Sequence, residues 1–305
     1  MINDENYMST PTIEVLLSTY NGEKYIDQQL MSLIKQEDVI IHILIRDDGS
    51  QDKTLEIVER YAKEYDFISI IKGKNKGFAK SFWDLIQKSG EYEYYAFCDQ
   101  DDIWDKRKLI SAIELIKKKN IKSPKPTLYT SDVQSMDNNF NLLKKHTFGF
   151  KGTLSLDDSL IRSVLPGCTF VFNNELKKIA CQYHGRIISH DWLIYQIALI
   201  FGQVVFDNNV YMNYRIHENN TIGVETKFGF IKSRINNLIK DKNKTRRTDV
   251  VKDILDCYGT QLSVDVFNEL VLFVNANKLS CLIKLLKKKE YRRFNFIFMA
   301  LLKKI

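Results

Sequence analysis

The sequence predicts an α/β fold, with a mainly parallel central sheet and helices on both of its faces. Three observations lead to this prediction. Apolar, strand-like segments alternate four times with amphipathic, helix-like segments between residues 13 and 116. The connections are short, and such alternation is typical of a parallel sheet covered by helices. Polar residues follow three of the strands at their carboxyl ends, where ligands bind in sheets of this kind.

Each predicted element follows from a local pattern of residues. A strand is expected where apolar and β-branched residues run into a turn signal, and a helix where apolar residues recur at helical spacing. The expected strands cover residues 13–18, 39–45, 67–71, 94–98, 128–132 and 168–172. The expected helices cover residues 25–34, 52–65, 77–86, 106–116 and 193–201.

Length and composition are those of a soluble globular protein. The 305 residues suffice for one large domain, or for one domain with an appendage. Hydrophobic residues make up 44% and charged residues 27%, which is ordinary for such a protein. The polar N-terminus has no signal peptide pattern, and no apolar run reaches the roughly 20 residues that span a bilayer. Five scattered cysteines indicate free thiols in a reducing cytosol and no zinc site.

The net charge of +7 is concentrated at the C-terminal end. Residues 284–305 contain six lysines and two arginines against one glutamate, so residues 1–283 are neutral overall. Proteins that bind nucleic acid usually carry a broad basic surface, so this distribution argues against a nucleic-acid partner. It indicates a local partner for the basic end instead.

A cluster of carboxylates follows the expected strand at 94–98. Asp99, Asp101 and Asp102 lie within four residues, and crowded carboxylates repel one another. A cation resolves this conflict, since Mg²⁺ is typically held by one or two carboxylates together with substrate phosphates. We therefore expect a metal-diphosphate site here. The alternative is that Asp102 or Asp105 only caps the next helix, which would leave the other carboxylates unexplained.

The first expected strand is not followed by a glycine-rich phosphate loop. Asn21-Gly22 does not match Gly-x-Gly-x-x-Gly, and the chain has no Gly-x4-Gly-Lys-Ser/Thr sequence. These absences argue against a dehydrogenase and against a P-loop enzyme. A bound diphosphate would then be held by a metal ion rather than by a loop of backbone N–H groups.

Four motifs occur in order along the first part of the chain. They are Ser-Thr-Tyr-Asn-Gly at 18–22, Asp-Asp-Gly-Ser-Gln-Asp-Lys-Thr at 47–54, Asn-Lys-Gly at 75–77 and Phe-Cys-Asp-Gln-Asp-Asp-Ile-Trp at 97–104. Together they resemble glycosyltransferase family 2, the inverting sugar transferases with the GT-A fold, and especially its rhamnosyltransferase-like branch of bacterial surface-polysaccharide enzymes. The resemblance covers residues 12–223. It implies a GT-A domain over residues 1–225 and a basic, helical C-terminal region over residues 226–305.

The resemblance implies that a nucleotide-diphospho-sugar donor binds at the ends of the first strands. Thr19 and Tyr20 would line the nucleotide pocket. Asp48 would accept a hydrogen bond from the N3–H of uracil or thymine, and Lys80 would approach the diphosphate. The donor-binding residues that it implies are Ser18, Thr19, Tyr20, Asn21, Asp47, Asp48, Gly77, Lys80, Asp99 and Gln100.

The resemblance also implies a divalent metal cofactor, Mn²⁺ or Mg²⁺. Asp101 would ligate the ion together with Asp99, which would also approach the ribose or the sugar. His217 lies in a segment, Tyr-Arg-Ile-His-Glu-Asn-Asn, that resembles the Tyr-Arg-x-His-x-x-Asn block of the family. It would be a third metal ligand or a diphosphate contact, although a lone histidine is usually structural.

The family places its catalytic base at the position of Asp191, in His190-Asp191-Trp192. The alternative role for Asp191 is to cap the apolar helix that follows. The acceptor side would be formed by Gly167, Cys168, His190 and Trp192. We expect Cys168 to be structural rather than nucleophilic, because an apolar flank raises the pKa of a thiol.

The C-terminal end is expected to form a basic amphipathic helix. Its apolar stripe comprises Phe294, Ile297, Phe298, Leu301, Leu302 and Ile305, flanked by Arg292, Arg293, Lys303 and Lys304. Such a helix suits an anionic membrane surface, which indicates a cytoplasmic protein held peripherally on the inner face of the membrane. The alternatives are that the stripe packs on the body of the protein or on a second copy in a homodimer.

The predicted function is inverting transfer of a sugar from a dTDP- or UDP-linked donor, with rhamnose as one candidate, to a saccharide acceptor. We expect a polyprenyl-diphosphate-linked acceptor in capsule, O-antigen or cell-wall polysaccharide synthesis. One alternative is a sugar nucleotidyltransferase, but these usually carry the glycine-rich loop that is missing here. A second is a non-catalytic scaffold that binds nucleotide-sugar.

Overall fold

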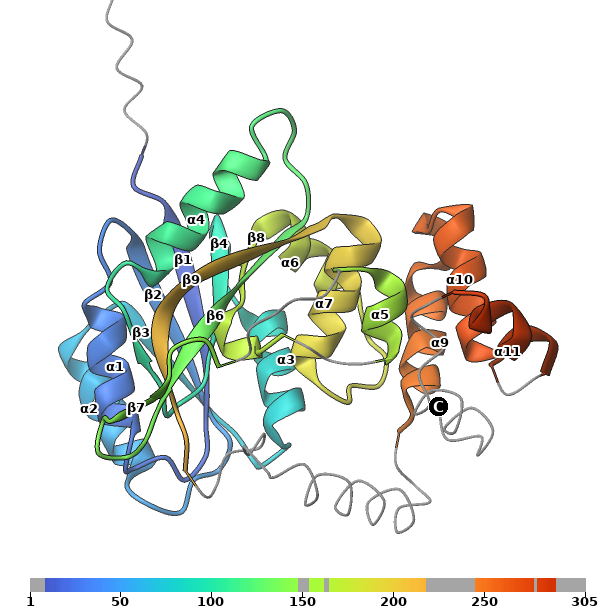
Figure 1. Cartoon of the computed structure of the whole chain (residues 1–305). Helices are drawn as coiled ribbons and strands as arrows, with labels where there is room; N and C mark the ends of the chain where they lie inside the picture. The colour runs from blue at the N-terminus through green and yellow to red at the C-terminus, as the bar shows by residue number, and fades with distance from the viewer. Residues whose placement is uncertain (1–8, 148–153, 162–164, 218–244, 277–278, 289–305) are drawn as a thin grey trace, which may run out of the picture.

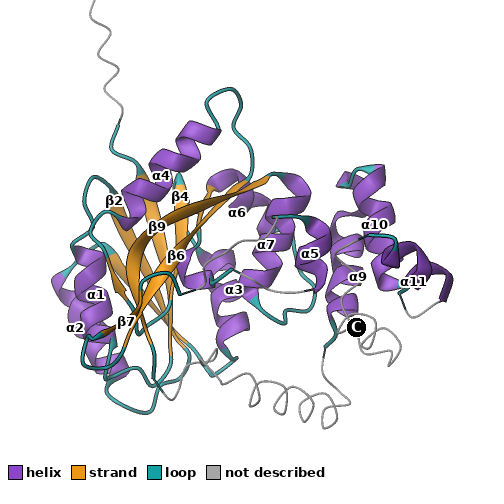
Figure 2. Cartoon of the chain, viewed as in Figure 1, coloured by secondary structure: helices purple, strands orange, loops and turns teal. Residues whose placement is uncertain are grey.

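The structure, a computed structural model, describes residues 9–147, 154–161, 165–217, 245–276 and 279–288. A twisted sheet occupies the left part of the view in Figure 1, with helices on both of its sides. The helices described between residues 247 and 286 stand at the right. Figure 2 shows the same division between a part rich in strands and a part that is helical.

The predicted alternation of strands and helices is confirmed over the first part of the chain. Its elements are β1 (Thr12–Thr19), α1 (Ile26–Ile34), β2 (Ile40–Asp47), α2 (Thr54–Glu64), β3 (Ile68–Lys72), α3 (Phe78–Lys88), β4 (Tyr94–Cys98), β5 (Ile103–Trp104) and α4 (Lys108–Lys119). The later elements are β6 (Thr127–Met136), β7 (Leu142–Lys144), α5 (Leu156–Ile161), η1 (Gly167–Thr169), β8 (Val171–Asn173), α6 (Asn174–Ala180), α7 (His190–Phe201), β9 (Gln203–Arg215), α9 (Arg247–Tyr258), η2 (Gly259–Gln261), α10 (Val264–Val274) and α11 (Leu279–Leu286).

The sheet combines a parallel half with a mixed half. Its order across the described residues is β3-β2-β1-β4-β8-β6-β9-β5, with β7 paired to β6. Strands β1 to β4 are parallel, as predicted. Strand β8 is antiparallel to both β4 and β6, whereas β6 and β9 are parallel. The second half therefore brings the end of β9 back beside the segment that follows β4.

The register of the parallel strands aligns their carboxyl ends. Leu17 of β1 lies opposite Ile45 of β2 and Cys98 of β4, and Thr19 lies opposite Asp47. The residues that follow these strands therefore meet along one line, which we call the carboxyl edge. Ligands bind at this position in open α/β sheets.

The expected strand at 168–172 is wrong in its first half. Residues Gly167–Thr169 form a short 3₁₀ helix, and the strand comprises only Val171–Asn173. Pro166 precedes this turn, its carbonyl accepts hydrogen bonds from the backbone N–H and hydroxyl of Thr169, and the N–H of Phe170 bonds to the carbonyl of Gly167. These local hydrogen bonds replace the strand ladder at this point.

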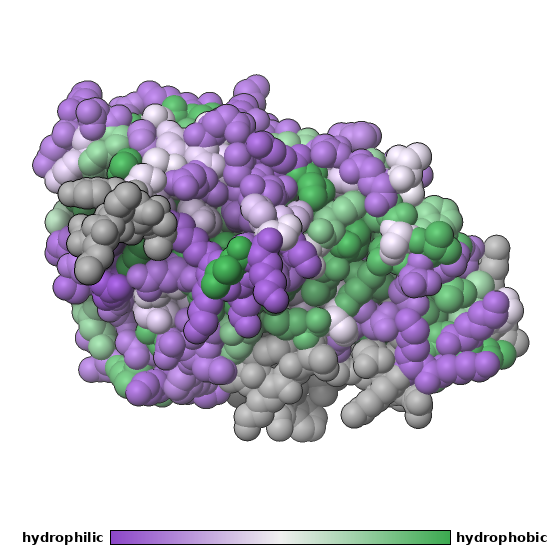
Figure 3. All heavy atoms as spheres, turned by 90° about the horizontal axis from the view of Figure 1, so that it is seen from above, coloured by the Kyte–Doolittle hydropathy of each residue, from purple (hydrophilic) through white to green (hydrophobic). Residues whose placement is uncertain are grey.

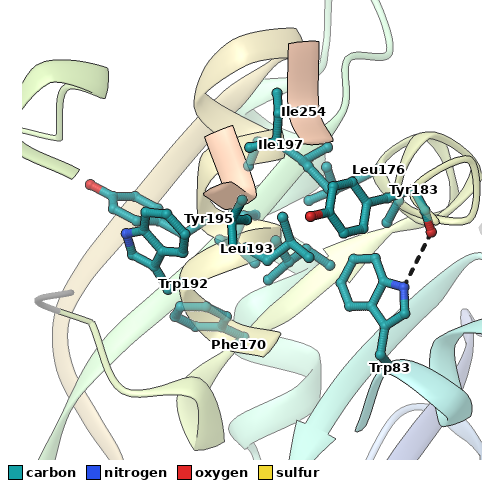
Figure 4. Close-up of a cluster of buried hydrophobic side chains, with 14 of the residues drawn as sticks. Trp83, Phe170, Leu176, Tyr183, Trp192, Leu193, Tyr195, Ile197 and Ile254 are labelled. Atoms are coloured by element: carbon teal, nitrogen blue, oxygen red, sulfur yellow. Dashed lines mark hydrogen bonds between the residues drawn. The ribbon is translucent and has the colours of Figure 1, made fainter. Parts of the chain in front are cut away.

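Two hydrophobic clusters cover the two faces of the sheet. One contains the apolar sides of α1, α2 and α4, for example Leu30, Val58 and Ile113. The other, shown in part in Figure 4, contains side chains of α3, α6 and α7. In it the Trp83 indole donates a 3.4 Å hydrogen bond to the carbonyl of Tyr183, drawn as the dashed line in Figure 4.

The described C-terminal helices pack on this second cluster. Val251, Ile254 and Tyr258 of α9 are fully buried in it, and the Tyr258 hydroxyl bonds to the Ile179 carbonyl at 2.8 Å. Burying a side chain such as Ile254 contributes about 1.5–3 kcal/mol. Arg186 and Asp253 add a salt bridge of 2.7 Å. Helix α9 is therefore part of the folded body.

Hydrophobic side chains gather on the side of the molecule that carries the C-terminal helices, as the view from above shows (Figure 3). Val264 and Phe267 of α10 are among the exposed large hydrophobic residues. The predicted apolar stripe from Phe294 to Ile305 lies outside the described residues. Among the helices that the structure describes, none has the length and apolar character needed to cross a bilayer.

Candidate active site

The loops at the carboxyl edge are tied together by Gln100. Its side-chain oxygen accepts hydrogen bonds from the Thr19 hydroxyl at 2.6 Å and from the backbone N–H of Tyr20 at 2.9 Å. Its amide nitrogen donates to the Tyr20 carbonyl at 3.1 Å. A β-carbon on Gly22 would lie 2.2 Å from the side-chain oxygen of Gln100, so a larger residue there would displace the Gln100 amide. Gln100 thus fixes the loop after β1 and leaves the Tyr20 ring exposed.

A second group of hydrogen bonds joins the loop after β1 to the loop after β2. Asp47 accepts hydrogen bonds from the N–H groups of Gly49 and Ser50 at 3.1 and 3.0 Å, and Gly49 adopts a φ of +84°. The Ser50 hydroxyl also accepts from the N–H of Asn21 at 3.0 Å. Asp47 and Asn21, both predicted to bind donor, therefore shape the loops of the edge.

Asp48 is buried and fully engaged. Its oxygens accept hydrogen bonds from the N–H groups of Lys76 and Gly77, each at 2.9 Å, and from the Arg46 guanidinium. Arg46 is itself only 1% exposed and also binds Asp84 at 2.9 Å. Asp48 therefore holds the loop before α3 against the edge. Its contact with a pyrimidine base stays a prediction.

The remaining residues predicted on the nucleotide side lie around α3. Ser18 shares a 2.6 Å hydrogen bond with the hydroxyl of Ser81. Gly77 precedes the helix with a φ of +79°, and no atom lies within 4 Å of the place where its β-carbon would be. Lys80 is exposed in the first turn. Its approach to the diphosphate stays a prediction.

Residues 99–102, which we call the acidic loop, meet the end of β9. His217 Nε2 lies 2.8 Å from Asp101 Oδ2, and the two side chains are 7% and 17% exposed. The Tyr25 ring stacks on the imidazole with a centroid separation of 4.8 Å. The structure thus brings together two of the three predicted metal ligands. The third, Asp99, is half-buried in the same loop.

Negative charge accumulates around Asp99. Burial raises the pKa of the Asp99 carboxyl to about 7, and the charges of Asp101 and Asp191 add to this rise. Asp191 follows Asp99 by more than 90 residues in the chain, so the fold brings the predicted base to the acidic loop. This convergence of carboxylates at one edge is the main electrostatic feature of the site.

Arg215 is a residue that we did not predict in the site. Its Nε donates to the carbonyl of Asp101 at 3.0 Å, and its backbone N–H donates to Asp102 at 3.3 Å. The guanidinium lies between the rings of Tyr25 and Phe140, at 5.0 and 5.1 Å. Arg215 therefore holds the acidic loop in place through the backbone of Asp101 and the side chain of Asp102. The sequence signal was its place two residues before His217.

The acidic loop does not cap α4 in the predicted alternative way. The helix begins at Lys108 after Arg107, without a side-chain cap. Asp105 accepts a 2.9 Å hydrogen bond from the N–H of Arg107 and so supports the turn before the helix. Asp102 instead bonds to the backbone of Arg215. Asp105 thus supports the turn before α4, and none of the three carboxylates of the loop caps the helix.

The donor set of the acidic loop fits a hard divalent cation. The carboxylates of Asp99 and Asp101 offer oxygen ligands, and the His217 imidazole, already in contact with Asp101, offers a nitrogen. In the described residues, Asp99, Asp102 and Cys168 form a group whose possible ligand atoms all lie within 4.8 Å of one another. Burial raises the pKa of the Cys168 thiol well above its usual range. A protonated thiol is a poor ligand, and metal binding by Asp101 stays a prediction.

Asp191 lies in the first turn of α7 and does not cap it, so the capping alternative is wrong. The cap position belongs to Ser189. Asp191 Oδ1 accepts hydrogen bonds from the N–H of Trp192 at 2.6 Å and from the Ser189 hydroxyl. The other carboxylate oxygen has no hydrogen bond to the described residues. A base held by one oxygen with the other oxygen free suits proton abstraction.

All four residues predicted on the acceptor side, Gly167, Cys168, His190 and Trp192, are buried. Gly167 packs directly against Asp191, and His190 precedes Asp191 in the chain. The His190 ring stacks on the Phe82 ring with a centroid separation of 3.9 Å. Burial lowers the pKa of His190 to about 4, so its ring is neutral at pH 7. Trp192 is buried and donates a 2.7 Å hydrogen bond to the carbonyl of Ser159, so it supports α7 from inside.

Comparison with known proteins connects this arrangement to sugar transfer. The family described as Glycosyl transferase family 2 matches residues 14–178. The protein named dTDP-rhamnosyl transferase RfbG from Shigella flexneri is 34% identical over 249 residues, which are 77% of this chain and 82% of that protein. Poly(ribitol-phosphate) beta-N-acetylglucosaminyltransferase TarS from Staphylococcus aureus is 35% identical over 104 residues, 33% of this chain and 18% of TarS.

Solved structures show the same fold. The crystal structure of S. aureus TarS 1-349 in complex with UDP-GlcNAc aligns with a TM-score of 0.56 at 18% identity, over 86% of this chain and 70% of that one. The mannosyltransferase PcManGT from Pyrobaculum calidifontis, in complex with GDP-Man and Mn²⁺, aligns with a TM-score of 0.54 at 15% identity, over 97% and 88%. At these identities the likeness concerns the fold alone.

Proposed function

This chain belongs to glycosyl transferase family 2 and is a glycosyltransferase with the GT-A fold, and from that premise we propose that it moves a sugar from a nucleotide-diphospho-sugar to a saccharide acceptor with inversion at the anomeric carbon. The observation that supports the proposal is the position of Asp191 near the acidic loop: Gly167 packs against Asp191, and the thiol of the next residue, Cys168, lies within 4.8 Å of the Asp99 carboxylate. A base and a diphosphate site on one edge are what a single displacement requires.

The donor that we propose is a dTDP-linked sugar, with rhamnose as the first candidate. The support is the 34% identity to a protein named dTDP-rhamnosyl transferase, over most of both chains. A UDP-linked sugar is the second candidate, because TarS was solved with UDP-GlcNAc. The exposed Tyr20 ring and the loop held by Asp48 would border the base, and Lys80 would reach the diphosphate.

The metal ion that we propose is Mn²⁺ or Mg²⁺, held by Asp101 and Asp99 with His217 as a third ligand or a diphosphate contact. A divalent ion bound there neutralises charge on the leaving nucleoside diphosphate. Arg215 and Tyr25 position these ligands from behind, because the first fixes the Asp101 backbone and the second stacks on the imidazole.

In the proposed reaction the free oxygen of Asp191 takes the proton from an acceptor hydroxyl. The hydroxyl oxygen attacks the anomeric carbon from the face opposite the diphosphate, the bond from that carbon to the diphosphate breaks, and the nucleoside diphosphate leaves with the bonding electrons. One displacement inverts the configuration, and no covalent intermediate on the enzyme is needed. Neutral His190 and Gly167 would shape the acceptor side.

We propose that the acceptor is a saccharide of a bacterial surface polysaccharide, carried on a polyprenyl diphosphate at the cytoplasmic face of the membrane. Residues 1–225 would be the catalytic domain. The basic region at residues 226–305, with six lysines and two arginines after position 283, would approach the anionic surface. A homodimer through the same region is the competing arrangement.

The test is thermal stability against UDP-, dTDP- and GDP-sugars with and without Mn²⁺, followed by transfer assays. A donor at 100 times its Kd adds about 2.7 kcal/mol of stability. We expect one pyrimidine nucleotide to stabilise the protein only with Mn²⁺, and Asp101→Asn to remove this effect. Asp105→Asn, an exposed neighbour outside the loop, is the matched control and should behave as wild type.

The variant Asp191→Asn separates the enzyme from its alternatives. We expect it to keep nucleotide binding and to lose transfer. A wild-type protein that binds the donor without turnover would favour the scaffold, and release of pyrophosphate would favour the nucleotidyltransferase. A lack of response to every nucleotide, or full activity of Asp191→Asn, would contradict the proposed function.

A further inference from the structure

A groove lies between α1, β5, β9 and the hairpin that joins β6 to β7 (Figure 1). Its volume is about 620 Å³, within the roughly 300–1,000 Å³ typical of ligand clefts. Its lining includes Gln28, Met31, Trp104, Gln134, Phe140 and Asn213. None of these residues is predicted to bind the donor, the metal or the reacting hydroxyl, so the proposed reaction leaves the groove without a role.

The groove continues from the proposed site along two strands. Ile103 and Trp104 of β5, which line it, come directly after the acidic loop. On β9, Asn213 lines it four residues before His217. Four residues of chain span at most about 14 Å. One extended molecule can therefore reach both the groove and the carboxyl edge.

The lining of the groove has no net charge. Its charged residues are two aspartates and two lysines, namely Asp27, Lys35, Asp105 and Lys106. Asp27 and Lys106 each form a salt bridge with a residue outside the groove. A phosphate needs an excess of basic groups, and a hard cation needs several oxygen ligands from acids and carbonyls. The lining therefore suits a neutral ligand.

Amide groups of the groove have unused hydrogen-bonding atoms. Gln134 and Asn213 lie opposite each other on β6 and β9, and the Gln134 amide nitrogen donates to the Asn213 side-chain oxygen. The other amide atom of each side chain forms no hydrogen bond in the described residues. The indole N–H of Trp104, in the wall of the groove, is buried and also has no partner among them. A ligand rich in hydroxyl groups uses donors and acceptors of this kind.

Apolar side chains form the rest of the lining. Phe140 is 54% exposed and Met31 is 36% exposed. The N–H of Phe140 closes a turn on the Asp137 carbonyl at 3.1 Å, and its φ of +64° is uncommon for a bulky residue. The Tyr25 hydroxyl donates to Asn138 of the same turn at 3.4 Å, which holds the turn beside α1. An aromatic ring is thereby kept at the groove instead of in the core.

Trp104 is fixed in the wall of the groove from inside. The Nζ of buried Lys108 lies 3.4 Å from the centre of its ring. On the other side of the groove, the Gln28 side-chain oxygen accepts a 2.7 Å hydrogen bond from Arg215. Arg215 also contacts the Phe140 ring at 5.1 Å and the Asp101 carbonyl at 3.0 Å. The groove and the acidic loop are therefore joined through one buried arginine.

We propose that this groove binds the acceptor saccharide at sugar units beyond the one that reacts. A sugar ring is uncharged, has an apolar C–H face and carries hydroxyl groups around its rim. Phe140 and Met31 suit the first of these surfaces, and the amides of Gln134 and Asn213 suit the second. This inference rests on the proposed function in taking the ligand to be the acceptor of sugar transfer.

Saturation-transfer NMR on the full chain, without donor or metal, tests the groove. The probes are rhamnose and N-acetylglucosamine oligosaccharides of one to four units. We expect an oligosaccharide of one series to bind, and Phe140→Ala and Gln134→Ala each to weaken this binding about tenfold. Phe140→Tyr keeps the ring and should bind as wild type. Leu142→Ala, at a residue that is 58% exposed on the same hairpin but outside the lining, is the matched control.

Transfer assays separate this inference from the proposed function. The ratio of kcat/KM for a trisaccharide acceptor to that for a monosaccharide acceptor should fall about tenfold in Phe140→Ala and stay unchanged in Leu142→Ala. A lack of oligosaccharide binding would overturn the proposal, as would binding and acceptor ratios that Phe140→Ala and Gln134→Ala leave unchanged. Oligosaccharide binding that depends on the groove, in a protein that transfers no sugar, would refute the proposed function and support the groove. Normal transfer that is indifferent to both substitutions would do the reverse.

Discussion

Gly167 packs against the backbone end of the Asp191 side chain. A β-carbon on Gly167 would lie 2.9 Å from Asp191 Cβ and 3.2 Å from His190 Nε2. The neighbour at 2.9 Å is not the mobile end of a long side chain, so a larger residue must displace the first turn of α7. The position of the proposed base therefore depends on a glycine in another part of the chain.

The substitution Gly167→Ala should reduce transfer without weakening donor binding. Displacement of a catalytic group by up to 1 Å costs about tenfold to a hundredfold in rate. We expect a fall of that size in kcat and an unchanged Kd for the nucleotide, measured by transfer assay and calorimetry. Gly259→Ala, where no atom lies within 4 Å of the added carbon, is the control and should be as active as wild type. An active Gly167→Ala would show that Asp191 tolerates the shift or is not the base.

The first half of the fold was predictable because its signals are local. Strand β4 coincides with the predicted residues 94–98, since an apolar run ends there in a sharp change to carboxylates. Along β1 to β3 the predicted bounds differ from the observed ones by one or two residues. Parallel pairing of such strands then determines that their polar ends share one edge.

The contacts that complete the site were not predictable in the same way. Arg215 and Asp101 are 114 residues apart, and their contact depends on β9 returning beside β5. Lys108 follows two exposed cations, and nothing in that local run distinguishes the one that packs inward. Asp48 is expected to contact a pyrimidine base, and its sequence gives no sign of the hydrogen bonds that it accepts from Arg46 and two backbone N–H groups. Tertiary packing decides each of these cases.

Arg46 should be one of the most sensitive positions for stability. It is buried and compensates both Asp48 and Asp84, so Arg46→Met would leave uncompensated buried charge. Removal of one partner of a buried ion pair costs about 3–5 kcal/mol. We expect that loss in urea unfolding, together with weaker donor binding because the loop before α3 is released.

The matched control for this prediction is the exposed pair of Arg60 and Asp27. Their side chains are 62% and 51% exposed, and surface pairs of this kind contribute at most about 1 kcal/mol. Arg60→Ala should therefore unfold close to wild type. If Arg46→Met lowers the free energy of unfolding by less than about 1 kcal/mol, the other hydrogen bonds of Asp48 and Asp84 are sufficient to stabilise these carboxylates.

Stability should also fall with rising pH because of Glu14. This residue of β1 is 6% exposed, and burial raises its pKa to about 7, against the hydrogen bond from the N–H of Gly90 and the charge of Lys177. A carboxyl that holds its proton more tightly when folded stabilises the fold fully below its unfolded pKa of 4.5, and this contribution is lost as pH rises through 7. Between pH 5 and pH 8 we expect Glu14 to account for a loss of about 2 kcal/mol.

Glu14→Gln keeps an acceptor for Gly90 but carries no charge, so its free energy of unfolding should vary less with pH than that of wild type. Glu56→Gln, an exposed glutamate on α2, should retain the wild-type profile in the same denaturant titrations. Identical pH profiles of wild type and Glu14→Gln would show that this carboxyl is ionised in the folded protein at pH 5.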